Sequence, residues 1–197
     1  MKLTWPAPER NKAAILAVLQ RVLPARGTLL EIASGTGQHA AYFAEHLAHW
    51  IVQPSDLDAP NLASIRARIL ESQLSNLREP LVIDACDAGW PVDEVDAVFN
   101  ANLIHIAPWA AALGLVRGAS LHLKSGGVLV VYGPFRIGGK HTAPSNEQFD
   151  RDLRERDARF GVRDLEEVVT IAEQQGLTLS ERVPMPANNQ TLIFRRV

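Results

Sequence analysis

Residues 28–39 read Thr-Leu-Leu-Glu-Ile-Ala-Ser-Gly-Thr-Gly-Gln-His. The apolar run Thr28–Ile32 predicts a short buried strand, and the next helix is expected over residues 38–48. Gly35 and Gly37 stand between the two elements, where residues without a Cβ let the backbone turn sharply and approach a ligand. The stretch therefore predicts a strand, a ligand-binding turn and a helix.

Helix and strand patterns alternate along the rest of the chain. Apolar residues at helical spacing predict helices over residues 10–23, 60–74, 108–123 and 163–175. Apolar runs predict strands over residues 50–53, 80–83, 95–101 and 128–132. This alternation is typical of an α/β fold, with a mostly parallel sheet covered by helices on both faces. We expect one domain over residues 1–197, with residues 134–160 as an irregular active-site segment.

The last two predicted strands break the parallel pattern. They cover residues 177–183 and 191–195, and only residues 184–190 join them. A parallel crossover needs a dozen or more residues, so these strands must pair as a hairpin. We therefore expect seven strands with one reversed strand, which lies beside the strand over residues 128–132.

Charge, apolar runs and cysteine content limit the classes of function and indicate the cellular compartment. The formal net charge of −2 does not favour general nucleic-acid binding, which normally needs a basic excess. No apolar run approaches membrane-spanning length, and no apolar run follows the first basic residue as in a secretory signal. Cys86 is the only cysteine, so an internal disulfide is impossible, and we expect a buried thiol in a cytoplasmic protein.

The glycine turn fits two cofactors. Gly35-x-Gly37-x-x-Ala40, with Asp56 further on, matches the dinucleotide fingerprint, and a plain tight turn is a third interpretation. Glu31 favours S-adenosylmethionine, because a carboxylate repels a pyrophosphate but attracts a ligand with a positive amine and sulfonium. Ala33 stands where the methyltransferase loop has its first glycine. The residues predicted to bind this cofactor from the loop are Glu31, Ala33, Ser34, Gly35, Gly37 and His39.

Polar residues also follow the second and third strands. Ligands of open α/β sheets bind at the carboxyl ends of the strands, so these residues are candidates. Asp56, with Leu57 beside it, can accept hydrogen bonds from both ribose hydroxyls, although Asp58 is a substitute or a helix cap. Asp84 and Ala85 can meet the exocyclic amine of adenine, with a solvated surface as the alternative.

The fourth strand ends where a methyl donor would meet its acceptor. Asn100 is assigned to the cofactor, and Asn102 and His105 are the candidate catalytic residues. His105 can orient an acceptor or remove a proton, or it can be a satisfied histidine at a helix start. His46 and His49 fit a solvated helix face better than a metal pair, and we predict no metal site.

The acceptor is expected at the same edge of the sheet. The polar segment after residue 132, the turn over residues 184–190 and the N-terminal residues should converge there. A polar and aromatic wall without strong charge suits a small neutral or zwitterionic molecule. The predicted substrate-binding residues are Arg10, Asn11, Tyr132, Phe135, His141, Ser145, Asn146, Asn188 and Asn189.

These motifs together resemble a small methyltransferase-like family that includes methyltransferase-like protein 26. The matching segments are residues 9–12, 30–39, 53–56, 102–106, 132–135, 142–146, 160–164 and 185–189, and Phe160 stands where the family is expected to have tryptophan. The resemblance implies the class I methyltransferase fold and an S-adenosylmethionine site. Such a chain would methylate a small-molecule acceptor, with S-adenosylhomocysteine as product. A non-catalytic S-adenosylmethionine-binding protein and an NAD-dependent oxidoreductase are the alternatives; Glu31 and the terminal hairpin oppose the latter.

Overall fold

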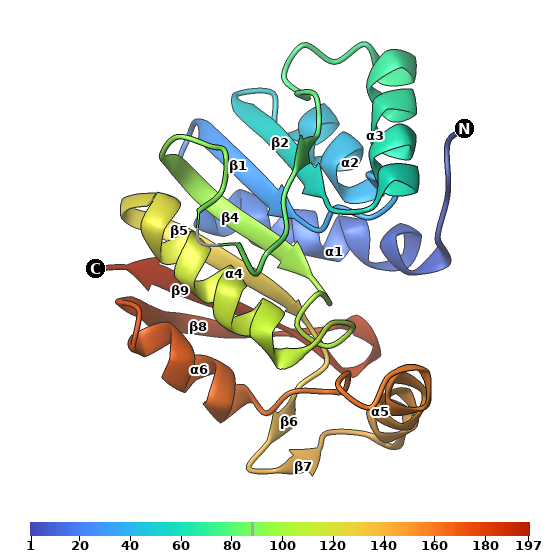
Figure 1. The fold of residues 1–197 in the computed structure, drawn as a ribbon. Helices are drawn as coiled ribbons and strands as arrows, with labels where there is room; N and C mark the ends of the chain where they lie inside the picture. The colour runs from blue at the N-terminus through green and yellow to red at the C-terminus, as the bar shows by residue number, and fades with distance from the viewer. Residues whose placement is uncertain (88) are drawn as a thin grey trace.

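The computed structural model describes residues 1–87 and 89–197, and across these residues one sheet has the strand order β3-β2-β1-β4-β5-β9-β8 (Figure 1). Its strands are β1 (Gly27–Ile32), β2 (Trp50–Asp56), β3 (Leu81–Val82), β4 (Val95–Ala101), β5 (Leu123–Gly133), β8 (Leu177–Met185) and β9 (Asn189–Arg196). The helices are α1 (Pro6–Val22), α2 (Gln38–His46), α3 (Ala59–Ser72), α4 (Trp109–His122), α5 (Pro144–Arg156) and α6 (Leu165–Glu173). The predicted seven-stranded α/β fold is therefore confirmed.

The reversed strand is β9. It pairs antiparallel with β5 on one side and with β8 on the other, whereas β1, β2, β3, β4 and β5 pair in parallel. Only the short 3-10 turn Pro186–Asn188 separates β8 from β9, which leaves no room for a crossover. The prediction of a terminal hairpin next to β5 is confirmed.

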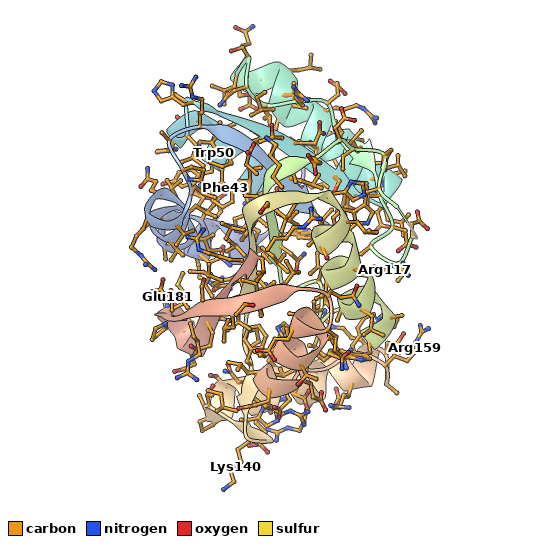
Figure 2. All side chains as sticks on the ribbon, turned by 90° about the vertical axis from the view of Figure 1, so that its left-hand side faces the viewer. Phe43, Trp50, Arg117, Lys140, Arg159 and Glu181 are labelled. Atoms are coloured by element: carbon orange, nitrogen blue, oxygen red, sulfur yellow. The ribbon has the colours of Figure 1, made fainter. Side chains whose placement is uncertain are left out.

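Two apolar cores lie on opposite faces of the sheet. Successive strand residues alternate between them, because side chains of a strand point to opposite faces. Leu29 packs with α1 and α2, and Leu30 packs with α4 and α6. Figure 2 shows Phe43 in the interior, whereas Lys140 and Arg159 point away from the protein. Helices therefore cover both faces and leave the strand ends open at the edge.

The strand order reverses between β1 and β4. The chain goes from β1 outward to β2 and β3, then returns across the sheet to β4 on the other side of β1 (Figure 1). In the register of this pair, Ile32 lies opposite Asn100. Ligands of such sheets bind at the carboxyl end of the point of reversal. The glycine turn after β1 therefore stands at the expected binding edge.

The prediction that residues 134–160 are irregular is wrong. They form a two-stranded ribbon of β6 (Arg136–Ile137) and β7 (Lys140–His141), followed by the helix α5. This helix has almost no apolar stripe, so its sequence lacks the signal of a core-facing helix. It buries Asn146, Asp150 and Leu153 instead. Pairs four residues apart, Glu147 with Arg151 and Asp150 with Arg154, stabilise it.

Other predicted boundaries move by a few residues. The first helix begins at Pro6 rather than residue 10, and β5 begins at Leu123 rather than residue 128. Cys86 was expected to be buried, and this is wrong: its side chain is exposed, in the turn that follows β3 and the buried Ala85. In the described part of the chain, none of the helices combines the length and the apolar character needed to cross a lipid bilayer.

Candidate functional site

The turn after β1 has an unusual backbone. Ala33, Gly35 and Gly37 have φ values of 56°, 55° and 78°, so every second residue is left-handed. This region favours glycine, because a Cβ crowds the following carbonyl. Ala33 therefore keeps the conformation of the expected glycine in spite of its side chain. A Cβ on Gly37 would lie 2.8 Å from Ile65, which explains why this position holds glycine where α2 meets α3.

Two buried oxygens at this turn lack partners. Oε2 of Glu31 and Oδ1 of Asn100 have no hydrogen-bond partner among the described residues. Both side chains are fully buried, at the ends of the neighbouring strands β1 and β4. The amide nitrogen of Asn100 donates to the carbonyl of Ile32 at 2.8 Å, so the unpaired atom is the acceptor oxygen. Buried acceptors are costly to leave unpaired. Glu31 pairs with Phe99 and Asn100 with Ile32, so the two side chains leave opposite faces of the sheet and each oxygen fits a donor on its own face.

Glu31 faces His39. Oε1 of Glu31 lies 3.6 Å from Nδ1 of His39. Burial raises the pKa of Glu31 to about 8, and the nearby charge of Asp56 acts in the same direction. Burial lowers the pKa of His39 to about 4. At neutral pH the two groups therefore form an uncharged pair.

The second strand end holds the glycine turn in place. Oδ2 of Asp56 accepts the Gly35 N–H at 2.7 Å, and its Oδ1 accepts from the Asp58 N–H and the Asn61 amide. Leu57 follows with an exposed side chain. Asp58 precedes α3, but its side chain makes no capping bond within the described chain. Asp56 is thus the carboxylate that connects the ends of β1 and β2.

The remaining predicted cofactor residues lie beyond β3. Oδ1 of Asp84 accepts the Cys86 N–H at 2.8 Å and stabilises a turn. Ala85 is buried against α4, where a Cβ on Gly114 would lie 2.1 Å from the Ala85 carbonyl oxygen. This close packing fixes the position of the turn. Burial, followed by the nearby Asp84 charge, raises the pKa of the Cys86 thiol, so it is no activated nucleophile.

An N-terminal strap, residues 2–11, runs across the glycine turn. The Trp5 N–H donates to Oε1 of Gln38 at 2.6 Å, and the Gln38 amide donates back to the Trp5 carbonyl at 3.1 Å. The Trp5 ring lies so close that a Cβ on Gly35 would meet it at 2.7 Å. Arg68 donates to the carbonyls of Leu3 and Thr36. The strap therefore closes one side of the turn.

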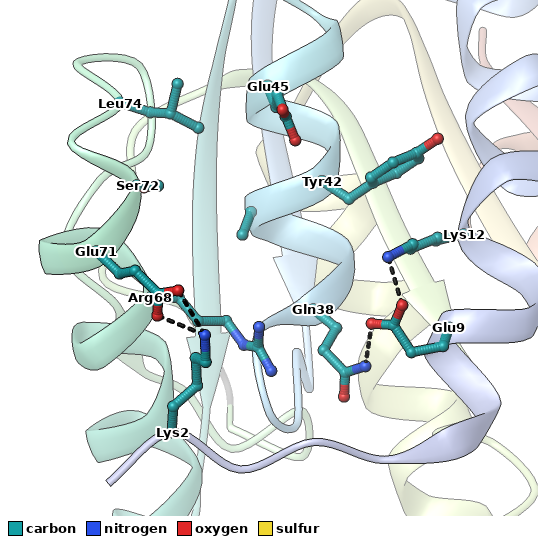
Figure 3. Close-up of a pocket in the computed structure, with 11 residues that line it drawn as sticks. Lys2, Glu9, Lys12, Gln38, Tyr42, Glu45, Arg68, Glu71, Ser72 and Leu74 are labelled. Carbon is teal, nitrogen blue, oxygen red and sulfur yellow. Dashed lines mark hydrogen bonds and ion pairs between the residues drawn. The ribbon is translucent and has the colours of Figure 1, made fainter.

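Figure 3 shows a groove of about 360 Å³ beside this strap, between α1, α2 and α3. Four of its charged side chains already pair with one another. Lys2 pairs with Glu71, and Glu9 accepts from Lys12 and Gln38. These contacts hold the strap against α2 and α3.

Asn11 connects the strap to the end of β5. Its Oδ1 lies 2.7 Å from Nε2 of His39, and its side chain shares a hydrogen bond with the Tyr132 hydroxyl. Burial raises the pKa of that hydroxyl, and the hydrogen bond with Asn11 opposes the rise. The side chains of Glu31, His39, Asn11 and Tyr132 thus lead from the glycine turn to a second cavity.

This second cavity is a cleft with a volume of about 750 Å³. It brings together the strap, the ends of β4 and β5, helix α5 and the turn between β8 and β9. Its lining residues are Ala7, Arg10, Asn11, Asn102, Tyr132, Pro134, Ser145, Asn146, Phe149, Pro186, Ala187, Asn188 and Asn189. Most of the predicted substrate-binding residues therefore lie around one cavity, as does Asn102.

Strained backbone gathers at the same cleft. In the described residues five non-glycine residues have positive φ, and Asn102, Ala187 and Asn188 among them line the cleft. A fourth is Ala33 in the glycine turn, and the fifth, Gln73, caps α3. Such conformations persist where surrounding contacts enforce them, often at functional sites.

Three predicted residues lie away from the cleft. Phe135 is fully buried and packs edge-on against His105 with ring centroids 5.1 Å apart. His141 lies 3.7 Å from Asp150, between β7 and α5. His105 is fully buried; its Nδ1 accepts the Arg163 N–H at 3.2 Å, and its carbonyl accepts the Gly161 N–H. Its catalytic role stays a prediction, and its contacts join the segment after β4 to Gly161 and Arg163.

The sequence interpretation missed several parts of the site. Gln38, which binds the strap, and Pro134, Pro186 and Ala187, which line the cleft, had no assigned role. Gln38 directly follows the second glycine, and a polar side chain at the start of that helix was the available signal. The other three carry no chemistry of their own, so only the packed structure identifies them.

Comparison with solved structures supports the fold. A mitomycin 7-O-methyltransferase has a TM-score of 0.82 at 16% identity, over 97% of this chain and 54% of that chain. An O-methyltransferase family 2 protein from Planctomyces limnophilus, in complex with apigenin, has a TM-score of 0.76 at 17% identity, over 94% and 62%. Human N-acetylserotonin methyltransferase, in complex with SAM, has a TM-score of 0.76 at 11% identity, over 96% and 52%. The chain thus has the class I methyltransferase fold and spans about half the length of these proteins.

A family model covers the chain itself. The model is described as a protein of unknown function, DUF938, and it matches residues 2–196. With a match over nearly the whole length, the chain belongs to the DUF938 family.

Proposed function

We propose that this protein is an S-adenosylmethionine-dependent methyltransferase that acts on a small molecule. The observation that carries the proposal is the unpaired buried Oε2 of Glu31, at the point where the strand order reverses. A cationic amine would donate to this oxygen, and an ionised Glu31 would attract its positive charge. The fold of the structural neighbours supports the same cofactor.

The other residues of this edge fit the rest of the cofactor. We assign the glycine turn, with Ala33, Ser34, Gly35 and Gly37, to the methionyl part, and His39 to the support of Glu31. Asp56 and Leu57 are assigned to the ribose and its surroundings. Asp84 and Ala85 are assigned to the adenine.

Bound at this edge, the cofactor would supply an electrophilic methyl group for transfer to a lone pair of the acceptor, with S-adenosylhomocysteine as the leaving group. The contribution of the chain is to hold the acceptor in line. Asn102 and Tyr132, at the ends of β4 and β5, form the part of the cleft next to Asn100. Orientation alone can supply a large share of such a rate, so the site does not depend on a dedicated base.

Two alternatives make different predictions. An NAD-dependent oxidoreductase would place a pyrophosphate near the Glu31 carboxyl, which would then have to stay protonated, whereas a cationic amine favours its ionised form. A non-catalytic protein would bind the cofactor without turnover.

We also propose a relationship to methyltransferase-like protein 26, on the shared sequence segments quoted above.

Calorimetric titration with S-adenosylmethionine, S-adenosylhomocysteine and NAD tests the cofactor. We expect both adenosyl compounds to bind and NAD not to bind. Glu31→Gln should weaken the binding of both, whereas Glu45→Gln, on the exposed face of α2, should not. Binding of NAD without binding of either adenosyl compound would refute the proposal. Incubation with a metabolite pool and a labelled methyl donor then tests turnover and separates an enzyme from a binding protein.

A further inference from the structure

The cleft at the ends of β4 and β5, which we assign to the acceptor, contains a single charged side chain. Among the described residues that line it, Arg10 carries a guanidinium and the others are neutral. The neighbouring acid, Glu9, is engaged with Lys12 and Gln38. Arg10 forms no ion pair with any residue that the structure describes, so its charge faces the cleft without a counter-ion.

Arg10 also acts on the floor of the cleft. Burial raises the pKa of the Tyr132 hydroxyl, and after the hydrogen bond with Asn11 the positive charge of Arg10 opposes that rise. The guanidinium is therefore close enough to Tyr132 to interact electrostatically with its hydroxyl. A ligand that reaches Tyr132 from the mouth of the cleft would pass beside Arg10.

The wall formed by α5 and the turn between β8 and β9 offers free acceptor oxygens. The Asn146 amide donates to Oγ1 of Thr142 and to the Asn188 carbonyl, both at 2.9 Å. The Asn188 amide donates to Oγ of Ser145, and the Asn189 amide donates to the Pro186 and Ala187 carbonyls. These bonds use the N–H groups to hold the turn against α5. The amide oxygens of the three asparagines accept no hydrogen bond within the described chain and remain available to a ligand.

From this arrangement we propose that Arg10 determines the acceptor class, by binding an anionic group of the acceptor while the Asn188–Asn189 turn accepts hydrogen bonds from a hydroxyl or amine. The anionic group is a carboxylate or a phosphate, since both have the oxygens that a guanidinium binds. Phe149, Pro134 and Pro186 add apolar surface to the lining of the same cleft, which suits a compact aromatic or aliphatic body. This inference rests on the proposed function, because it concerns the acceptor of that reaction.

The test uses simple probes on the full chain saturated with S-adenosylhomocysteine. The carboxylate arm compares 4-hydroxybenzoate with 4-hydroxybenzamide, which differ only in the charged group. The phosphate arm compares 4-hydroxyphenyl phosphate with 4-methoxyphenol, which keeps the hydroxyl and lacks the charge. Binding is followed by NMR titration at low and at high salt. We expect the preferred anion to bind about tenfold tighter than its neutral partner, and salt to reduce that preference.

Variants assign the effect to Arg10. Arg10→Gln should abolish the preference for the anion, whereas Arg10→Lys should retain part of it. Arg21→Gln is the matched control, because Arg21 lies on the same helix but pairs with Glu181 outside the cleft. The control should behave as the wild type.

The inference is overturned if neither anion binds better than its neutral partner, or if Arg10→Gln keeps the preference. The affinity for S-adenosylhomocysteine, measured on every protein, separates this failure from that of the proposed function. Loss of cofactor binding in the wild type would reject the proposed function. Normal cofactor binding without an anion preference would reject only the assignment of Arg10.

Discussion

Glu31 and His39 form a buried pair, with Oε1 of Glu31 3.6 Å from Nδ1 of His39 and side chains that are 2% and 6% exposed. Burial penalises the charge on both groups, which raises the pKa of the acid and lowers that of the imidazole. Nε2 of His39 faces Oδ1 of Asn11 at 2.7 Å, so it is the protonated nitrogen and Nδ1 is left to face Glu31. We therefore expect Glu31 to lose its proton when a cation binds beside this pair.

The affinity for S-adenosylhomocysteine should rise with pH. The cationic amine favours an ionised Glu31, and the pKa of about 8 keeps this group protonated at lower pH. Binding then releases a proton, so affinity should increase by about tenfold or more between about pH 6 and 7.5. Calorimetry in buffers of different ionisation enthalpy measures the release. Glu31→Gln should give weak binding without this dependence, and a flat profile in the wild type would contradict the assignment.

The free energy of unfolding should also depend on pH through Glu31, but it should fall as the pH rises. The pKa of Glu31 is raised from 4.5 to about 8, so its contribution is complete below about pH 4.5 and is lost as pH rises through 8. The pKa of His39 is lowered from 6.5 to about 4, so its contribution is lost as pH falls through that range. Between about pH 6.5 and 8 the fall due to Glu31 should stand alone. Thermal unfolding should show this fall in the wild type and not in Glu31→Gln.

Asp56→Ala should weaken cofactor binding by about tenfold or more, as expected when a charge-assisted bond to the ribose is lost. The variant should also melt at a lower temperature, because Asp56 accepts the Gly35 N–H at 2.7 Å. Asp58→Ala is the control, since that side chain makes no capping bond in the described part of the chain. Titration beside a thermal melt measures both effects. Unchanged affinity in folded Asp56→Ala would remove this residue from the cofactor site.

Ala33→Gly should stabilise the protein. Ala33 has a φ of 56°, a conformation that costs a residue with a Cβ on the order of 1 kcal/mol. Relief of that strain should raise the melting temperature by about 2–4 °C without loss of cofactor binding. Gly35→Ala should act in the opposite way, because its Cβ would lie 2.7 Å from the Trp5 ring. A lower melting temperature for Ala33→Gly would show that its methyl group contributes more packing than strain.

His105 and Asn102 should respond differently to mutation. His105→Ala leaves a cavity and removes the acceptor of the Arg163 N–H, so it should lower stability by on the order of 2–3 kcal/mol. Asn102→Gly removes the amide but keeps the left-handed backbone at φ 65°, so stability should change little. With an identified acceptor, Asn102→Gly should lower turnover at unchanged cofactor affinity. Normal turnover in that variant would exclude Asn102 from the acceptor site.

Local pattern was sufficient for most of the fold. Alternating apolar runs identified the strands of the sheet, and the short 184–190 connection required the reversed strand. It was insufficient for α5, because that helix buries Asn146, Asp150 and Leu153 rather than an apolar stripe. A helix of this kind is stabilised by ion pairs and by polar contacts with the rest of the protein, which the spacing of apolar residues does not reveal.

The sequence by itself determined the chemistry that the site can offer: Glu31 before a glycine turn, Asp56 after the next strand, and a set of polar residues for one sheet edge. Tertiary structure decided which of these side chains meet. It buried His105 and Phe135 away from the cleft and brought Arg10, Asn188 and Asn189 to the lining of one cavity. The reason is physical. Spacing along a chain fixes the side chain's face on a strand or helix, whereas exposure at a cleft depends on how distant elements pack together.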